Sequence, residues 1–246
     1  MAGGKIFKKN FGRATGVRAK SQIDKRNIVT DSDLAIETTI RRHLSRAFPG
    51  HLILGEEFGG KTQIQKGEHL WILDPIDGTN NFAQGIPLAC ISIGLWNYKG
   101  PLAAVVYNPI TKEMYTALRG QGAHLNSKSI RVSKTKDPMR AVGALGWSKS
   151  YKKSSGIKLY RRAFDRFGKA RAFGTTTMQM CFVADGRLDF YFAQGIYIWD
   201  MAAAALIVQE AGGKVSEIGG APIGPNSRSV IASNNNFHNY IIKNLR

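Results

Sequence analysis

The sequence of 246 residues predicts a mixed α/β (α+β) fold, and three patterns in it predict that class. Apolar residues recur at helical spacing over residues 32–47. Short β-branched and aromatic runs separated by turn residues fill residues 89–118, which is typical of an antiparallel sheet. A nearly all-apolar segment over residues 200–211 ends in two glycines and predicts a buried helix.

The remaining elements follow from shorter apolar runs and their end signals. Residues 51–55 and 70–73 are apolar runs that end at a glycine or lead into an aspartate, which suits buried strands that continue into loops. Helices are expected over residues 158–167 and 176–184, and a strand is expected over residues 188–193.

Two subdomains are expected, with a boundary near residues 133–142. Residues 1–135 would form an N-terminal α+β subdomain that holds most of the candidate metal ligands. Residues 136–246 would form a C-terminal α/β subdomain that supplies Asp200 and the groups on the substrate side.

The composition indicates a globular protein with an uneven distribution of charge. Hydrophobic residues make up 43% of the chain, which is enough for a sizeable core. The net charge is +18, and residues 128–171 alone carry fourteen bases and two acids. Such an excess attracts anionic ligands and nucleic acid, or simply keeps a protein soluble.

Cysteine content and hydropathy exclude several classes of protein. Cys90 and Cys181 are too few for a disulfide framework or a cysteine-based zinc site, so a reducing compartment, the cytoplasm, is expected. No apolar run approaches the length that spans a bilayer, and the N-terminal residues lack the apolar core of a signal peptide. We therefore expect no membrane association.

The most informative segment is WILDPIDGTNNF at residues 71–82. Asp74 and Asp77 follow a predicted strand and lie three residues apart, so their carboxylates can converge. Close carboxylates repel one another unless a cation or a shared proton neutralises them, and their hard oxygens suit Mg²⁺. Gly78 and Thr79 then offer backbone N–H groups to phosphate oxygens. The alternative is an Asx-type turn between two strands.

The segment GEEFGG at residues 55–60 places two more carboxylates, Glu56 and Glu57, at the end of a predicted strand. With the next two residues it also matches the phosphate-loop pattern G-x-x-x-x-G-K-[ST]. We expect no nucleotide there, because the glutamates would repel phosphate. Only seven residues separate Thr62 from Leu70, too few for the helix and crossover of that fold.

Two further aspartates lie at predicted helix starts. Asp200 follows Trp199 at the beginning of the apolar helix, and Asp33 ends the segment NIVTDSD at residues 27–33. Each can be an N-cap or a polar group delivered to a site.

Together these motifs resemble the inositol monophosphatase family of magnesium-dependent, lithium-sensitive phosphatases. The resemblance rests on NIVTDSD, GEEFGG, WILDPIDGTNNF, the strand-rich middle, RAFGTTTMQMCFVADGRLDF and IWDMAAAALIVQEAGG, and it covers residues 20–233. It implies a layered α-β-α-β-α sandwich and hydrolysis of a small phosphate monoester. A homodimer is also implied.

Carried over residue by residue, the resemblance implies a site with two or three Mg²⁺ ions. One ion would bind Glu56, Asp74 and the carbonyl of Ile76, and a second would bind Asp74, Asp77 and Asp200. A third would share Glu56. The resemblance also implies that Asp33, Glu56 and Thr79 take part in catalysis. Gly78 and Thr79 would bind the phosphate group. The residues on the substrate side would be Asp77, Arg171, Gly174, Thr176 and Ala193.

Substrate choice is expected to depend on departures from the family pattern. Members that bind inositol carry a glutamate where this chain has Ala193, and an alanine where it has Thr176. An inositol phosphate or a related sugar phosphate ranks first. Histidinol phosphate, fructose 1,6-bisphosphate and a 3′-phosphonucleotide are the alternatives.

A nucleic-acid-associated protein is the alternative of another class. Aromatic residues are interleaved with the bases of the 128–171 segment and just beyond it, and aromatic rings can stack on bases. They are Tyr151, Tyr160, Phe164, Phe167 and Phe173. Against this, the helical spacing of residues 160, 164 and 167 is also typical of a face turned to the core.

Overall fold

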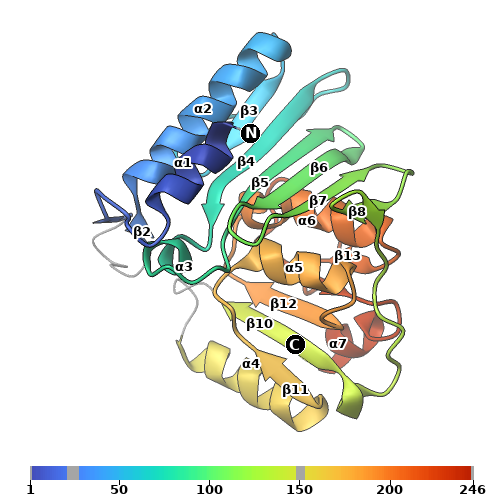
Figure 1. The fold of residues 1–246 in the computed structure, drawn as a ribbon. Helices are drawn as coiled ribbons and strands as arrows, with labels where there is room; N and C mark the ends of the chain where they lie inside the picture. The colour runs from blue at the N-terminus through green and yellow to red at the C-terminus, as the bar shows by residue number, and fades with distance from the viewer. Residues whose placement is uncertain (1, 21–27, 148–152, 245–246) are drawn as a thin grey trace.

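A seven-stranded sheet forms the upper half of the computed structural model, which describes residues 2–20, 28–147 and 153–244 (Figure 1). Its strands are antiparallel except for the first pair, in which β3 and β4 run parallel. In spatial order they are β3 (Leu52–Gly55), β4 (His69–Asp77), β5 (Cys90–Asn97), β6 (Gly100–Asn108), β7 (Glu113–Leu118), β8 (Ala123–Leu125) and β9 (Lys128–Ser129). The meander predicted over residues 89–118 is confirmed.

A second, five-stranded sheet is built from the C-terminal part of the chain. Its first three strands run parallel and its last two are antiparallel to their neighbours. The spatial order is β11 (Lys169–Arg171), β10 (Val142–Trp147), β12 (Phe190–Gln194), β14 (Ser229–Ser233) and β13 (Lys214–Ser216). A short antiparallel pair, β1 (Arg18–Ala19) and β2 (Ile28–Val29), lies near the N-terminus.

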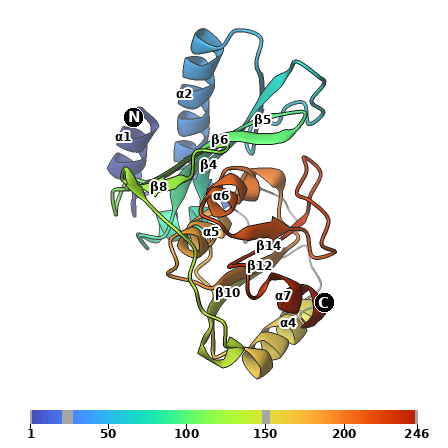
Figure 2. The ribbon, with the colours of Figure 1, turned by 90° about the vertical axis from the view of Figure 1, so that its right-hand side faces the viewer.

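Helices cover both outer faces and fill the space between the sheets (Figures 1 and 2). The outer pair over the larger sheet is α1 (Ala2–Asn10) and α2 (Asp31–Ala47), and the central pair is α5 (Thr176–Ala184) and α6 (Ile198–Glu210). The smaller sheet carries α4 (Lys153–Arg166) and α7 (His238–Asn244) on its other face; α3 (Thr79–Ala83) and the 3₁₀ turn η1 (Pro138–Arg140) are short connections. The predicted α-β-α-β-α sandwich is therefore confirmed.

The central layer explains why two helices are apolar on every side. Helix α5 is buried along its whole length, and α6 is buried from Met201 to Val208. A helix between two sheets has no face toward solvent, so it carries no polar stripe. Both helices belong to one hydrophobic core that also contains residues of both sheets, such as Trp96 and Tyr191.

The division into two subdomains at residue 135 stays a prediction. The larger sheet lies within residues 52–129 and the smaller within residues 142–233. The shared core joins them, because side chains from both sheets pack on α5 and α6.

Several elements differ from the sequence prediction. The segment after Leu73, expected as a turn, continues strand β4 to Asp77, with an irregular register against β5 between Asp74 and Asp77. Helix α4 begins five residues earlier than expected. The sequence analysis did not predict α1, α7, β10, β11, β13 or β14, whose short segments have weak periodicity and obtain their stability from tertiary packing. None of the helices in the described ranges is long and apolar enough to cross a membrane.

A buried histidine fastens α7 to the smaller sheet. His238 Nε2 lies 2.9 Å from Ser216 Oγ on β13, and its Nδ1 lies 2.9 Å from Ser233 Oγ on β14. Burial, with a smaller contribution from Lys214, lowers the pKa of His238 to about 4. The imidazole is therefore neutral in the folded protein at pH 7.

The pKa of His238 is 6.5 in the unfolded chain and about 4 in the folded chain. The contribution of His238 to the free energy of unfolding is therefore complete above pH 6.5 and falls as the pH drops toward 4. We expect the His238→Gln variant to have a lower free energy of unfolding than the wild type at pH 7. Between pH 7 and pH 5, that free energy should fall less in the variant than in the wild type. Urea unfolding at both values measures this, with His43→Gln as the exposed control. Equal pH sensitivity of wild type and variant would contradict the assignment.

Candidate active site

Three aspartates from distant parts of the chain meet between the two sheets. Asp74 and Asp77 come from the end of β4, and Asp200 comes from the first turn of α6. One carboxylate oxygen of each lies within 4.8 Å of the others. Asp74 Oδ1 is buried, and no donor among the described residues hydrogen-bonds to it. A buried acceptor without a donor, between two other carboxylates, has the chemistry of a cation ligand.

The aspartates hold their position at an electrostatic cost. Burial and the neighbouring carboxylates of Glu56, Asp77 and Asp200 raise the pKa of Asp74 well above its ordinary value. Burial likewise raises the pKa of Asp200, to which Glu56 and Asp77 add. A bound divalent cation would reverse this by favouring the charged forms.

Asp77 is tied to the N-terminus of α5. Its Oδ1 accepts a hydrogen bond from the N–H of Thr176 (3.2 Å), and its Oδ2 accepts one from the N–H of Thr177 (2.8 Å) and another from the Thr175 hydroxyl. These donors oppose the effect of burial, which nonetheless raises the pKa of Asp77. The Thr177 hydroxyl also donates to the carbonyl of Asp200 (2.8 Å), so α5 links two of the aspartates. The sequence analysis missed Thr175 and Thr177.

Asp33 and Asp200 occupy the same position on different helices, and neither is an N-cap. Asp33 Oδ2 accepts the backbone N–H of Thr30, the N-cap of α2, at 2.8 Å. Asp200 Oδ2 accepts the N–H of Tyr197, the N-cap of α6, at 2.6 Å. Each aspartate is therefore the third helical residue and bonds back to the cap, which fixes its carboxylate at the helix end.

A lysine that the sequence analysis missed neutralises part of the acidic site. Lys20 Nζ lies 2.6 Å from Glu56 Oε1 and 2.6 Å from Glu57 Oε1. Burial lowers the pKa of Lys20, but the two glutamates more than offset this and the pKa rises. Burial raises the pKa of Glu56, against the opposing effect of Lys20. The lysine gave no signal in the sequence, because it belongs to a generally basic segment and precedes its partners Glu56 and Glu57 by 36 and 37 residues.

The GEEFGG segment is a tight turn and not a phosphate cradle. Gly55 and Gly59 exchange two backbone hydrogen bonds, and the N–H groups of Glu57 and Phe58 donate to the carboxylate of Glu37 on α2. An added Cβ at Gly55 would lie 1.9 Å from Glu37 Oε1. The turn's N–H groups are thus already used by a carboxylate of the protein itself. No helix follows it before β4, as the sequence analysis expected.

Thr79 connects Asp33 to the strand that carries Asp74. Its hydroxyl lies 3.0 Å from the carbonyl of Ile76 and 3.3 Å from Asp33 Oδ1. Burial raises the pKa of Asp33 to about 6, against the hydrogen bonds from Thr30. Gly78, the residue before Thr79, has a backbone φ of 86°, and a Cβ added there would lie 2.9 Å from the carbonyl oxygen of Leu88. Glycine is therefore required where β4 turns into α3.

The expected substrate-side residues occupy different surroundings. Gly174, with φ of 74°, packs beside the amide of Asn81, and the hydroxyl of Thr176 lies 3.0 Å from that of Tyr191. Ala193 is fully buried in β12, and Arg171 is exposed on the edge strand β11 and donates to the carbonyl of Ala170. Only Thr176 is joined to an aspartate of the site, through its N–H.

The inositol monophosphatase family model matches residues 1–246. The chain belongs to this family. It is 38% identical to inositol monophosphatase 2 of Solanum lycopersicum, over 98% of this chain and 93% of that protein. Two solved structures, each 32% identical, share the fold: the extragenic suppressor protein suhB from Bartonella henselae (TM-score 0.91, covering 100% and 95% of the two chains) and the Thermotoga maritima IMPase (TM-score 0.89, covering 99% and 92%).

Membership of the inositol monophosphatase family makes the protein a phosphoric monoester hydrolase of a metal-dependent type. The acidic cluster of Asp74, Asp77 and Asp200 is a group that could bind the metal. The motifs on which the resemblance was based therefore lead to the correct family.

In this phosphatase most of the aromatics that the structure describes in and beside the basic segment are turned to the core. Phe167 is 1% exposed and packs in the core between α4 and the smaller sheet, and Phe173 packs against the central core. The hydroxyl of half-buried Tyr160 donates to the carbonyl of Leu145. Phe164 is exposed, and Tyr151 lies outside the described residues. Among the described aromatics of the nucleic-acid hypothesis, Phe164 alone is exposed, so the support for it is chiefly positive charge.

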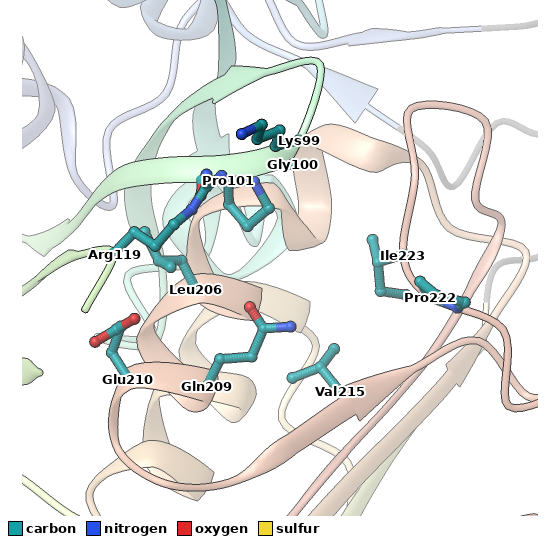
Figure 3. A pocket seen from close by; sticks show the side chains of 10 residues that line it. All are labelled: Lys99, Gly100, Pro101, Arg119, Leu206, Gln209, Glu210, Val215, Pro222 and Ile223. Atoms are coloured by element: carbon teal, nitrogen blue, oxygen red, sulfur yellow. The ribbon is translucent and has the colours of Figure 1, made fainter.

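A cavity of about 340 Å³ lies apart from this phosphatase site (Figure 3). It opens between the β5–β6 turn, the C-terminal half of α6 and β13, and none of the residues discussed above lines it. The cluster of Asp74, Asp77 and Asp200, and not this cavity, is the candidate active site.

The repulsion among the aspartates predicts the behaviour of the metal-free protein. Because the pKa of Asp74 is raised in the folded state, its ionisation costs stability as the pH rises. We expect Asp74→Asn to raise Tm at pH 8 in chelator by about 2–4 °C, roughly 1 kcal/mol for a chain of this size, and to abolish the further rise caused by Mg²⁺.

Thermal unfolding with EDTA and with Mg²⁺ measures both effects. Asp165→Asn, an exposed change on α4, is the control for loss of one negative charge. A destabilised Asp74→Asn variant that still responds to Mg²⁺ would exclude Asp74 as a ligand.

Proposed function

We propose that the protein hydrolyses a small phosphate monoester with Mg²⁺ bound by Glu56, Asp74, the Ile76 carbonyl, Asp77 and Asp200. The observation that carries the proposal is the unpartnered Asp74 Oδ1 among carboxylates that lie within 4.8 Å. An all-oxygen donor set suits Mg²⁺, and two ions would balance the four carboxylates, with a third ion sharing Glu56 when substrate phosphate adds negative charge. When bound, Mg²⁺ supplies a water of lowered pKa and positive charge against the phosphoryl oxygens.

The chain's own residues would position and deprotonate the attacking water. The hydroxyl of Thr79 donates a hydrogen bond to the Ile76 carbonyl or to Asp33. The lone pairs of its oxygen can then accept a hydrogen bond from the attacking water. Asp33, with a pKa near 6, can take the proton at neutral pH. Glu56 completes the acidic wall, and its charge is moderated by Lys20.

The first turn of α3 would bind the phosphate group. The N–H groups of Gly78 and Thr79 precede the first intrahelical hydrogen bonds of α3 and so lack partners within the helix. Gly78 has no side chain at the approach. No covalent enzyme intermediate is needed, because water is the nucleophile.

We propose an inositol monophosphate or a related sugar phosphate as substrate. The names of the relatives support this, since inositol monophosphatases recur among them. Histidinol phosphate, fructose 1,6-bisphosphate and a 3′-phosphonucleotide are the alternatives, because Ala193 brings no polar group to the substrate side. Arg171, Gly174, Thr176 and Asp77 would shape that side.

We also propose inhibition by lithium and a homodimer, which the family resemblance implies. A cytoplasmic location is proposed from the low cysteine content, and two subdomains divided at residue 135 from the sequence pattern. Salt-sensitive, non-specific binding of nucleic acid by the basic segment is proposed as well. Charge alone supports the last of these.

Phosphate release from a substrate panel tests the proposed function. The panel is inositol 1-phosphate, fructose 1,6-bisphosphate, histidinol phosphate and a 3′-phosphonucleotide, with Mg²⁺ and with EDTA. We expect Mg²⁺-dependent release from one compound, and a loss on the order of 10³-fold in Asp77→Asn with the circular dichroism spectrum unchanged. Retained activity in that variant would remove Asp77 from the site, and a silent panel would contradict the proposed substrate class.

Thr79 gives a finer test of the water-positioning step. We expect Thr79→Ala to lower kcat on the order of 10²-fold with little change in KM, because it removes an interaction with the attacking group and none with the leaving alcohol. Thr79→Ser keeps the hydroxyl and should restore most of the activity. Equal losses in both variants would show that the hydroxyl is not the active feature.

A further inference from the structure

The cavity in Figure 3 combines an apolar wall with cations that have no acidic partner. Leu206 on α6, Val215 on β13 and Ile223 beyond it are packed against the central core. These residues line one side of a hollow of about 340 Å³, which falls in the size range of small-molecule sites. Figure 3 shows Lys99 and Arg119 across from Pro222 and Ile223, with the amide of Gln209 between them.

The two cations are held beside the hollow in different ways. Lys99 lies in the β5–β6 turn, where its backbone N–H donates to Asn97 Oδ1 at 2.9 Å and its ammonium lies over the ring of Tyr98, 5.6 Å from the centroid. Arg119 Nε donates to the carbonyl of Pro101 at 2.6 Å, which places the guanidinium beside Gly100. In the part of the chain that the structure describes, no carboxylate forms an ion pair with either side chain.

The one acidic group that lines the cavity is occupied elsewhere. Glu210 accepts hydrogen bonds from the N–H of Gly120 and the N–H of Gly122, both at 2.8 Å. Its carboxylate therefore closes the β7–β8 turn and forms no ion pair with Lys99 or Arg119 among the described residues. The lining carries two positive charges, the negative charge of Glu210 and the amide of Gln209, so the cavity has an excess of one positive charge.

We propose that this cavity is a second binding site, separate from the aspartate site, for a small organic anion with an apolar body. A carboxylate or phosphate group would lie between Lys99 and Arg119 and accept charge-assisted hydrogen bonds. The apolar part would cover Leu206, Val215 and Ile223, and Gln209 would contact a polar atom at the junction. A small molecule is favoured over a peptide strand, because β13, the adjacent edge strand, has only three residues.

The site shares a helix with the aspartate cluster but does not depend on it. Asp200 lies in the first turn of α6 and Glu210 at its end, about 15 Å apart along the axis. Binding can therefore be measured in EDTA, where the phosphatase site is inactive. Success or failure of the measurement is then independent of the proposed function.

The probes are 4-phenylbutyrate and its neutral amide, 4-phenylbutanamide, which differ only in the charged group. Titration of the ¹⁵N-labelled protein by NMR gives each affinity and locates the site through the backbone signals of Gly100 and Val215. We expect the carboxylate to bind about tenfold more tightly than the amide. Lys99→Glu with Arg119→Glu should abolish this difference.

Two further variants separate charge and shape from general effects. Lys66→Glu with Lys128→Glu makes the same change of charge on exposed lysines elsewhere and should leave the preference intact. Val215→Trp fills the cavity and should weaken binding of both probes. Equal affinities for acid and amide in the wild type would overturn the proposal, as would shifts confined to other regions or undiminished binding to Val215→Trp.

Discussion

Mutual repulsion of Asp74, Asp77 and Asp200 is the constraint on which the centre of this molecule depends. Three carboxylates within 4.8 Å in the interior would push the surrounding elements apart unless each were held by its own scaffold. Asp77 is held by two N–H groups and a hydroxyl of α5, and Asp200 by its own helix cap. Asp74 has one oxygen without any donor among the described residues. Asp74, the carboxylate with an oxygen that has no donor, is therefore the group that a bound cation would stabilise most.

The central helices supply that scaffold because they are packed on both sides. Helix α5 directs its N-terminus at Asp77, where the helix dipole and the free N–H groups favour negative charge. Helix α6 begins at the same place and carries Asp200 in its first turn. Both are enclosed between two sheets, so a shift of either would disturb a continuous core. Hydrophobic packing of α5 and α6 therefore offsets the free-energy cost of holding the carboxylates close together.

Positive charge is distributed in three distinct ways around this acidic centre. Lys20 enters the site and pairs with Glu56 and Glu57. Several bases of the 128–171 segment, among them Lys158, Arg161 and Arg162, are exposed on α4, which covers the outer face of the smaller sheet (Figure 1). Lys99 and Arg119 flank an apolar hollow at the opposite end of α6 from Asp200. The net charge of +18 therefore has no single role.

The sequence by itself determined the class of fold, the family and the residue types of the site. The helix over residues 32–47, the meander and the buried helix from Asp200 were all predicted, because strong periodicity and end signals are local properties. The convergence of Asp200 with Asp74 and Asp77 was available only through the family resemblance, since spacing along the chain says nothing about residues 123 positions apart.

Tertiary structure alone decided how those residues are held. Sequence patterns gave no sign that Lys20 pairs with Glu56, that Glu37 fills the GEEFGG turn, or that Thr175 and Thr177 bind Asp77 and Asp200. Asp33 and Asp200 were read as possible caps, whereas each is the third residue of its helix and bonds back to the cap. Such contacts depend on the direction of side chains across long separations, and only the packing of both sheets on α5 and α6 sets that direction.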